Sequence, residues 1–165
     1  MRYKPGVIFI LSVLILLGCS DYSPSTGSYK AKGISLNFPA GWAKAATTPF
    51  SIITVENSVQ SAQMNLVIQD LPENMTFEQF MQRVSSNQNR AGAREIDSGK
   101  IDMGGSEGHW SLREMNVQGH IFTAITYTAL NDRKAYSVMG IAKKELFRDY
   151  ESVFDAAAKS VRFVD

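Results

Sequence analysis

The sequence is short of the residues on which several common protein classes depend. It has one cysteine and two histidines in 165 residues, so a framework of intramolecular disulfides and a Cys-rich zinc module are both excluded. Its 17 basic residues nearly balance its 16 acidic residues, and a net charge of +1 excludes a strongly basic nucleic-acid-binding protein. Hydrophobic residues make up 44% of the chain, which excludes a disordered polymer and predicts one globular domain.

The longest apolar run is too short for a membrane-spanning helix. Residues 7–17 (VIFILSVLILL) are apolar except for Ser12, whereas a helix needs about 20 residues to cross a bilayer. Arg2 and Lys4 precede the run, and no acidic residue does. A basic start followed by a short apolar run is typical of a secretory signal peptide. We therefore expect residues 1–18 to direct export and to be removed.

The apolar run ends in Leu16-Leu17-Gly18-Cys19, and Cys19 is the only thiol of the chain. These four residues resemble a bacterial lipobox, with Leu17 at a position where Ala or Ser is commoner. The resemblance implies cleavage before Cys19, a diacylglycerol thioether on its sulfur and an amide-linked acyl chain, such as palmitate. Several acyl chains hold a protein firmly at a bilayer, whereas one holds it only marginally. The alternatives are an ordinary signal peptide and a short uncleaved anchor.

The residues after Cys19 bear on where such a lipoprotein would lie. Ser20 follows the cysteine, and Asp21 comes one place later. In the enterobacterial sorting rule, Asp directly after the cysteine favours the inner membrane, so Ser20 resembles the outer-membrane class. We expect a periplasm-facing protein at the outer rather than the inner membrane. Residues 19–28 are rich in Ser, Thr, Pro and Gly and predict a flexible tether, followed by one domain over residues 29–165.

Hydrophobic patterning in the mature chain predicts strands, a helix, a meander of strands and a final helix. Apolar and polar residues alternate over 34–38, and short runs rich in Ile and Val follow. Thr76 as N-cap and Gln79 three places later predict a capping box. The apolar stripe of the helix that begins there consists of Phe77, Phe80, Met81 and Val84. The predicted strands are 34–38, 50–55, 64–68, 95–103, 109–117, 120–130 and 133–142, and the predicted helices are 76–88 and 145–161.

The meander is the most informative stretch. A two-residue turn at Gln118-Gly119 would place Trp110 opposite Tyr127 and Leu112 opposite Ile125, all on one side of the sheet. A second turn at Asn131-Asp132 would place Tyr136 beside Tyr127 and Val138 beside Ile125. Both registers predict a continuous apolar face, which a one-residue slip would expose to water.

Two short motifs resemble those of a known family. Residues 33–42 (GISLNFPAGW) end a strand in an aromatic-Pro-x-x-Trp turn, and the last helix runs into Ser160-Val161-Arg162-Phe163. Both resemble the PsbP-like family, which includes Mog and DcrB-like proteins, although Val161 stands where Phe is usual. The resemblance implies an α+β fold in which a twisted antiparallel sheet carries helices on its faces, an α/β/α sandwich. It carries over no metal-binding or cofactor-binding residue.

The residues that could support chemistry are few. His109 and His120 would lie about 30 Å apart along paired strands, at about 3.3 Å per residue, so they cannot share a metal. No G-x-S-x-G motif occurs, and Gly105-Ser106-Glu107-Gly108 predicts a turn. Carboxylates four apart on the final helix predict a solvated face. Trp42 and Trp110 predict core packing, with a ligand cleft as the alternative. We therefore expect no catalytic, cofactor or metal site.

The sequence alone favours a non-enzymatic, membrane-anchored periplasmic lipoprotein that binds a protein partner as an accessory or assembly factor of the cell envelope. A second hypothesis is a carrier of a small apolar ligand, with a cleft between the sheet and a helix lined by residues such as Trp42, Trp110 or Tyr127. A third is a hydrolase, which would need clustered Ser, His and acidic side chains.

Overall fold

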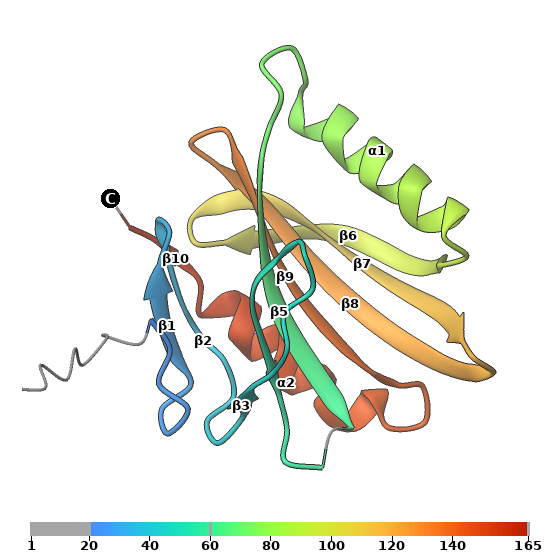
Figure 1. Ribbon diagram of the computed structural model, residues 1–165. Coiled ribbons are helices and arrows are strands. Elements are labelled where there is room, and N and C mark those ends of the chain that lie inside the picture. Colours follow the sequence, from blue (N-terminus) through green and yellow to red (C-terminus); the bar gives the residue numbers. More distant parts are fainter. Residues whose placement is uncertain (1–20, 60, 165) are drawn as a thin grey trace, which may run out of the picture.

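The computed structural model describes residues 21–59 and 61–164, so the expected signal peptide, Cys19 and Ser20 lie outside the described residues. A seven-stranded antiparallel sheet of order β3-β4-β5-β9-β8-β7-β6 forms the body, and β1-β2-β10 form a smaller antiparallel sheet. Helices α1 and α2 cover opposite faces of the large sheet (Figure 1). This arrangement confirms the predicted α+β class. The elements are β1 (Ser28–Ala31), β2 (Ile34–Asn37), β3 (Ala43–Lys44), β4 (Ser51–Glu56), β5 (Ala62–Asp70), α1 (Phe77–Arg90), β6 (Arg94–Met103), β7 (Ser106–Val117), β8 (His120–Asn131), β9 (Lys134–Lys143), α2 (Phe147–Lys159) and β10 (Arg162–Phe163).

The first hairpin of the meander has the predicted register. Val117 pairs with His120 across Gln118-Gly119, and Trp110 therefore lies opposite Tyr127. Both turn residues have positive φ, 53° and 85°, as a type I′ turn requires. Leu112 likewise lies opposite Ile125, as predicted.

The second hairpin differs from the prediction by two residues. Tyr127 lies opposite Val138, Ile125 opposite Gly140, and Tyr136 opposite Ala129. A shift of two keeps every side chain on its expected face, because side chains alternate along a strand. The shift arises because the chain turns at Asp132-Arg133, where both residues have positive φ.

The side chain of Arg133 explains how this turn is held. One of its guanidinium nitrogens donates to the carbonyls of Leu71 and Pro72, at 3.3 and 2.6 Å. These bonds tie the turn to the segment between β5 and α1. A left-handed arginine is unfavourable by itself, so this contact offsets a cost that the sequence does not reveal.

The main core lies between α2 and the large sheet. Phe154 of α2 is fully buried over Gly140 of β9, where an added Cβ would lie 2.2 Å from the aromatic ring. Trp42 meets Tyr150 and Phe154 edge-on, with ring centroids 6.1 and 6.5 Å apart. Trp42 is therefore a core residue, as predicted.

Helix α1 begins as predicted. Thr76 accepts a hydrogen bond from the Gln79 backbone N–H, and the Gln79 side chain accepts one from the Thr76 N–H, which completes the capping box. The only buried side chain of the helix among the described residues is Phe80, which packs with Leu71 and Ala135. The rest of the apolar stripe is half-buried.

The flexible tether expected over residues 19–28 is wrong from Asp21 onward. Tyr22 is 3% exposed, and its hydroxyl donates to the Trp42 carbonyl at 2.8 Å. The backbone of Tyr22 forms an isolated antiparallel β-bridge with Tyr29 of β1, and the Tyr22 ring packs edge-on against Phe38. One buried aromatic side chain thus outweighs the turn-rich composition around it.

Candidate functional site

A cleft of about 540 Å³ separates α2 from strands β6, β7 and β8. Its apolar floor is formed by Ile101, Trp110, Ile125 and Tyr127, on the sheet face that the meander predicted to be apolar. Charged side chains of both signs surround this floor, so the cleft suits a ligand or peptide with an apolar centre and polar ends. The other lining residues are Lys100, Arg148, Glu151, Ser152, Asp155 and Lys159. We call this space the α2 cleft.

Trp110 is placed in the α2 cleft by the glycine opposite it. Gly99 pairs with Trp110 across β6 and β7, and a Cβ on Gly99 would lie 2.8 Å from the indole Nε1. The ring therefore lies across the backbone of β6 and stays half-buried. The expectation of simple core packing is corrected for Trp110, which packs on the edge of the core and also lines the cleft.

Tyr127 gives the floor a hydrogen-bond donor. Burial raises the pKa of its phenol, and the charges of Asp155 and Glu151 raise it further. The hydroxyl therefore stays protonated in neutral solution. Asp155 is paired with Lys159 at 2.6 Å, whereas Arg148 and Glu151 have no ion-pair partner in the described part of the chain. These two exposed charges are free to bind polar groups of a ligand.

The α2 cleft does not contain the groups that a hydrolase would use. Ser152 is its one serine, and neither histidine lines it. His120 is exposed beside the turn after β7, and His109 lies half-buried on the opposite face of the sheet. Within residues 21–59 and 61–164, no three His, Cys, Asp or Glu side chains gather closely enough to hold a metal ion.

The helices of the described residues include no candidate membrane span. Neither α1 nor α2 combines the length and the apolar character that a bilayer crossing requires.

A sequence profile of the family described as PsbP-like protein matches residues 19–154. The matched segment includes the α2 cleft apart from its last two lining residues, Asp155 and Lys159. No sequence among the curated proteins matches the chain.

Several solved structures share the fold at low sequence identity. Cyanobacterial PsbP (CyanoP) from Synechocystis sp. PCC 6803 is 14% identical, with a TM-score of 0.69, over 86% of this chain and 94% of that one. LpqN of Mycobacterium tuberculosis, described as involved in cell envelope biogenesis, is 10% identical, with a TM-score of 0.67, over 80% and 83%. The Saccharomyces cerevisiae Ran-binding protein Mog1p is 9% identical, with a TM-score of 0.59, over 86% and 97%.

Proposed function

Because the chain belongs to the PsbP-like family, we propose that it is a non-enzymatic accessory protein of the cell envelope that binds a partner protein in the α2 cleft. The observation that carries this proposal is the apolar floor of the cleft, which the half-buried Trp110 leaves partly open to solvent. An accessible aromatic side chain surrounded by charges is typical of an energetic anchor in a protein interface. The role of LpqN in envelope biogenesis supports the cellular setting.

Binding in the α2 cleft can be tested by photo-crosslinking in intact cells. A photoreactive amino acid at Ser152, on the rim, is expected to give one discrete protein adduct. The same group at Gln82, an exposed position of α1, is the matched control and should not give that adduct. Adding Trp110→Ala to the Ser152 probe should remove the adduct. Equal labelling from both positions, or an adduct unaffected by Trp110→Ala, would contradict the proposal.

The proposal places the protein at a membrane through lipid on Cys19. The lipobox-like residues Leu16 to Cys19 support this anchor. Labelling cells with a radioactive fatty acid should label the wild-type protein and leave Cys19→Ser unlabelled. Density separation of the membranes would then test the preference for the outer membrane. A wild-type protein without label, found in the soluble fraction, would refute the anchor without bearing on the α2 cleft.

A second candidate function is the transport or storage of a small apolar ligand. The volume of the α2 cleft favours it, because ligand pockets usually hold about 300–1,000 Å³. Native mass spectrometry of protein taken from its own envelope should then show a bound small molecule of constant mass. Trp110→Ala should lose that molecule, whereas Gln82→Ala should retain it. A ligand-free spectrum together with a protein adduct at Ser152 would favour the partner-binding function.

A further inference from the structure

The sheet face beneath α1 differs in chemistry from the face beneath α2. Where α2 packs on apolar side chains, the opposite side of β7, β8 and β9 presents hydroxyl groups. The alternation of strands sends Ser111, Thr126, Thr128 and Ser137 to this side, since their neighbours Trp110 and Tyr127 point into the core. A sheet face covered by a helix is normally apolar, and on this polar face the hydroxyls of Thr128 and Ser137 bond each other at 2.8 Å.

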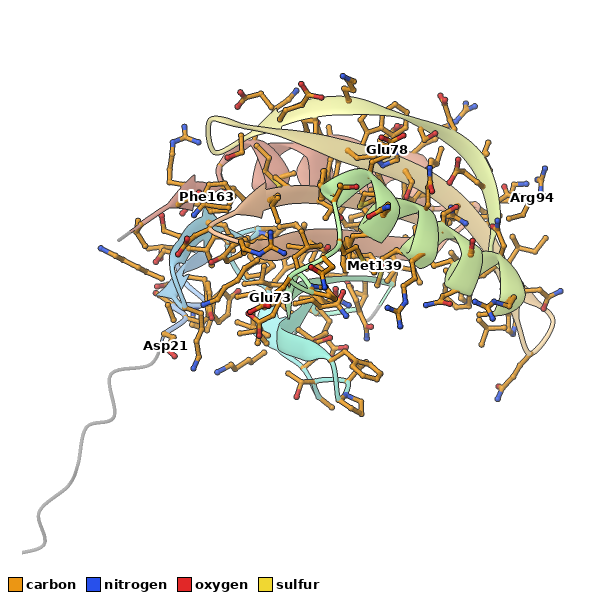
Figure 2. All side chains as sticks on the ribbon, turned by 90° about the horizontal axis from the view of Figure 1, so that it is seen from above. Asp21, Glu73, Glu78, Arg94, Met139 and Phe163 are labelled. Carbon is orange, nitrogen blue, oxygen red and sulfur yellow. The ribbon has the colours of Figure 1, made fainter. Side chains whose placement is uncertain are left out.

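A cavity of about 250 Å³ lies between this face and α1. Helix α1 contributes Phe80, Met81 and Val84 together with Gln88, so the α1 wall is mainly apolar, whereas the wall from the strands is mainly polar. Figure 2 shows Met139 of β9 close to α1. We call this space the α1 cavity. The residues that line it are Thr48, Ser51, Asn65, Val67, Gln69, Phe80, Met81, Val84, Gln88, Ser111, Thr126, Thr128, Ser137 and Met139.

Buried polar atoms without partners gather on this same face. Asn65 is 9% exposed and lines the α1 cavity, yet its Oδ1 accepts no hydrogen bond. Its cross-strand neighbour Thr54 is 4% exposed, and its Oγ1 is also unpartnered. The other two such atoms in the described residues, His109 Nδ1 and Arg113 Nε, belong to the same face. Buried polar groups are rarely left unpaired. Of these four atoms, Asn65 Oδ1 belongs to a residue that lines the α1 cavity, and it indicates that something polar occupies the space.

The ends of the α1 cavity are held by separate contacts. Arg113, 3% exposed, donates to Ser85 and Asn89 of α1 and pairs with Glu95 of β6. Phe80 packs at the other end against Leu71. The gap between these contacts is therefore built into the fold.

The chemistry of the walls defines the class of ligand. No charged side chain lines the α1 cavity, and an ion buried without a counter-charge would be strongly unfavourable. The volume is several times the share of about 30 Å³ that one water takes in the liquid, and lies below the roughly 300 Å³ of drug-sized sites. We propose that the α1 cavity binds one neutral sugar ring, its hydroxyls toward the sheet and a C–H face toward Phe80 and Met81.

Solution NMR can test this proposal on the intact domain. The probes are glucose, galactose, mannose and N-acetylglucosamine, each at millimolar concentration. At least one is expected to shift the methyl signals of Met81, Met139 and Thr126 in a saturable way. Glucose 6-phosphate should bind at least tenfold more weakly than glucose, because its charge has no partner. The methyl glycoside of the bound sugar mimics a sugar residue within a glycan. If the glycoside binds as tightly as the free sugar, the ligand can be a glycan residue, and if it does not bind, the ligand is a free monosaccharide.

Two variants on one strand provide the matched comparison. Thr126→Val removes a hydroxyl from the α1 cavity and should weaken sugar binding about fivefold, the effect of one hydrogen bond. Thr123→Val removes a buried hydroxyl from the opposite face of β8 and should leave binding unchanged. The proposal is overturned if no probe shifts the methyl signals, if only water is found in the cavity, or if cyclohexanol binds as tightly as glucose.

Discussion

At the scale of single residues, Glu114 joins parts of the chain that the sequence keeps apart. Its carboxylate pairs with Arg94 of β6 at 2.9 Å and with Lys144, after β9, at 2.6 Å. The hydrogen bond from Lys144 is the main reason why the pKa of Glu114 lies below its usual value of 4.5, and Arg94 lowers it further. A basic residue near the start of α2 interacts unfavourably with the helix dipole. The ion pair with Glu114 explains how Lys144 is tolerated at this position.

The depressed pKa of Glu114 predicts a pH-dependent effect of Glu114→Gln. The native state holds the ionised form, so this residue stabilises the fold above its unfolded pKa. That contribution is lost as the pH falls through the lower folded pKa. In urea unfolding, wild type should be more stable than Glu114→Gln at neutral pH, and the difference should vanish well below pH 4.5. A difference that persists in acid would contradict this explanation, and Glu107→Gln, in an exposed pair with Lys100, is the control.

Asn65 provides a second prediction at this scale. Its buried Oδ1 lacks a partner in the described structure, and such a group costs about 1–3 kcal/mol. Asn65→Leu, of similar shape, should therefore stabilise the ligand-free protein by about 1 kcal/mol. Asn65→Asp, which buries a charge, should destabilise it. The midpoint of urea unfolding measures both, and a destabilising Asn65→Leu would indicate that the amide has a structural role.

At the scale of elements, α2 depends on a close approach to β9. Because Gly140 has no side chain, the ring of Phe154 can lie directly against the backbone of β9. This contact lets α2 pack close to the sheet. The two faces of the large sheet bury different amounts of apolar surface. The α2 side holds most of the hydrophobic core, whereas the buried residues of the α1 side are Leu71, Phe80 and Ala135.

Gly140→Ala is expected to destabilise the fold by about 1–3 kcal/mol, the usual cost of overpacking a core. The new methyl group would meet Phe154, so the helix or the ring must move. Adding Phe154→Leu should make the double variant more stable than the sum of the two single effects. Calorimetric unfolding of the four proteins measures the coupling. Additive effects would show that Gly140 and Phe154 do not interact as described.

Long elements could be predicted from the sequence, and short ones could not. Periodic patterns identified both helices and the meander within a few residues of their bounds. Strands β3 and β10 have two residues each, too few for any periodicity. Strand β3 forms by pairing with β4, the next strand in the chain, and β10 forms because the end of the chain meets β2. The register of β9 was wrong because no glycine marks Asp132-Arg133 as a left-handed turn.

The two cavities were predictable to different degrees. The apolar face with Trp110 and Tyr127 follows from alternation in the sequence, whereas the gap above it depends on where α2 lies. Thr126 and Thr128 alternate with the apolar residues of β8, and this polar side of the strand would be expected from the sequence alone to face solvent. Only the structure shows that α1 covers them.

At the scale of the whole molecule, the first described residues stabilise the domain. Tyr22 belongs to the main core, together with Trp42 and Phe38. The small sheet and the aromatic-Pro-x-x-Trp turn therefore depend on a residue that precedes β1.

Tyr22→Ala should destabilise the protein by about 3–5 kcal/mol, the usual loss for a large buried aromatic side chain. Tyr22→Phe should cost about 1 kcal/mol, because it keeps the buried ring and removes the hydrogen bond to Trp42. Thermal unfolding of the mature protein measures both. If Tyr22→Ala unfolds like wild type, then residues 21–28 are a tether after all.

The burial of Tyr22 also sets how far the protein can reach. Three residue steps separate Tyr22 from Cys19, a span of about 10 Å at most. In the proposed lipidated form, the domain would rest against the lipid headgroups instead of sampling the periplasmic space. Asp21 and Arg94 lie at opposite ends of the molecule (Figure 2), so the end near β1 would face the bilayer and the end near Arg94 would point away from it. A partner would have to travel to the membrane surface to be bound.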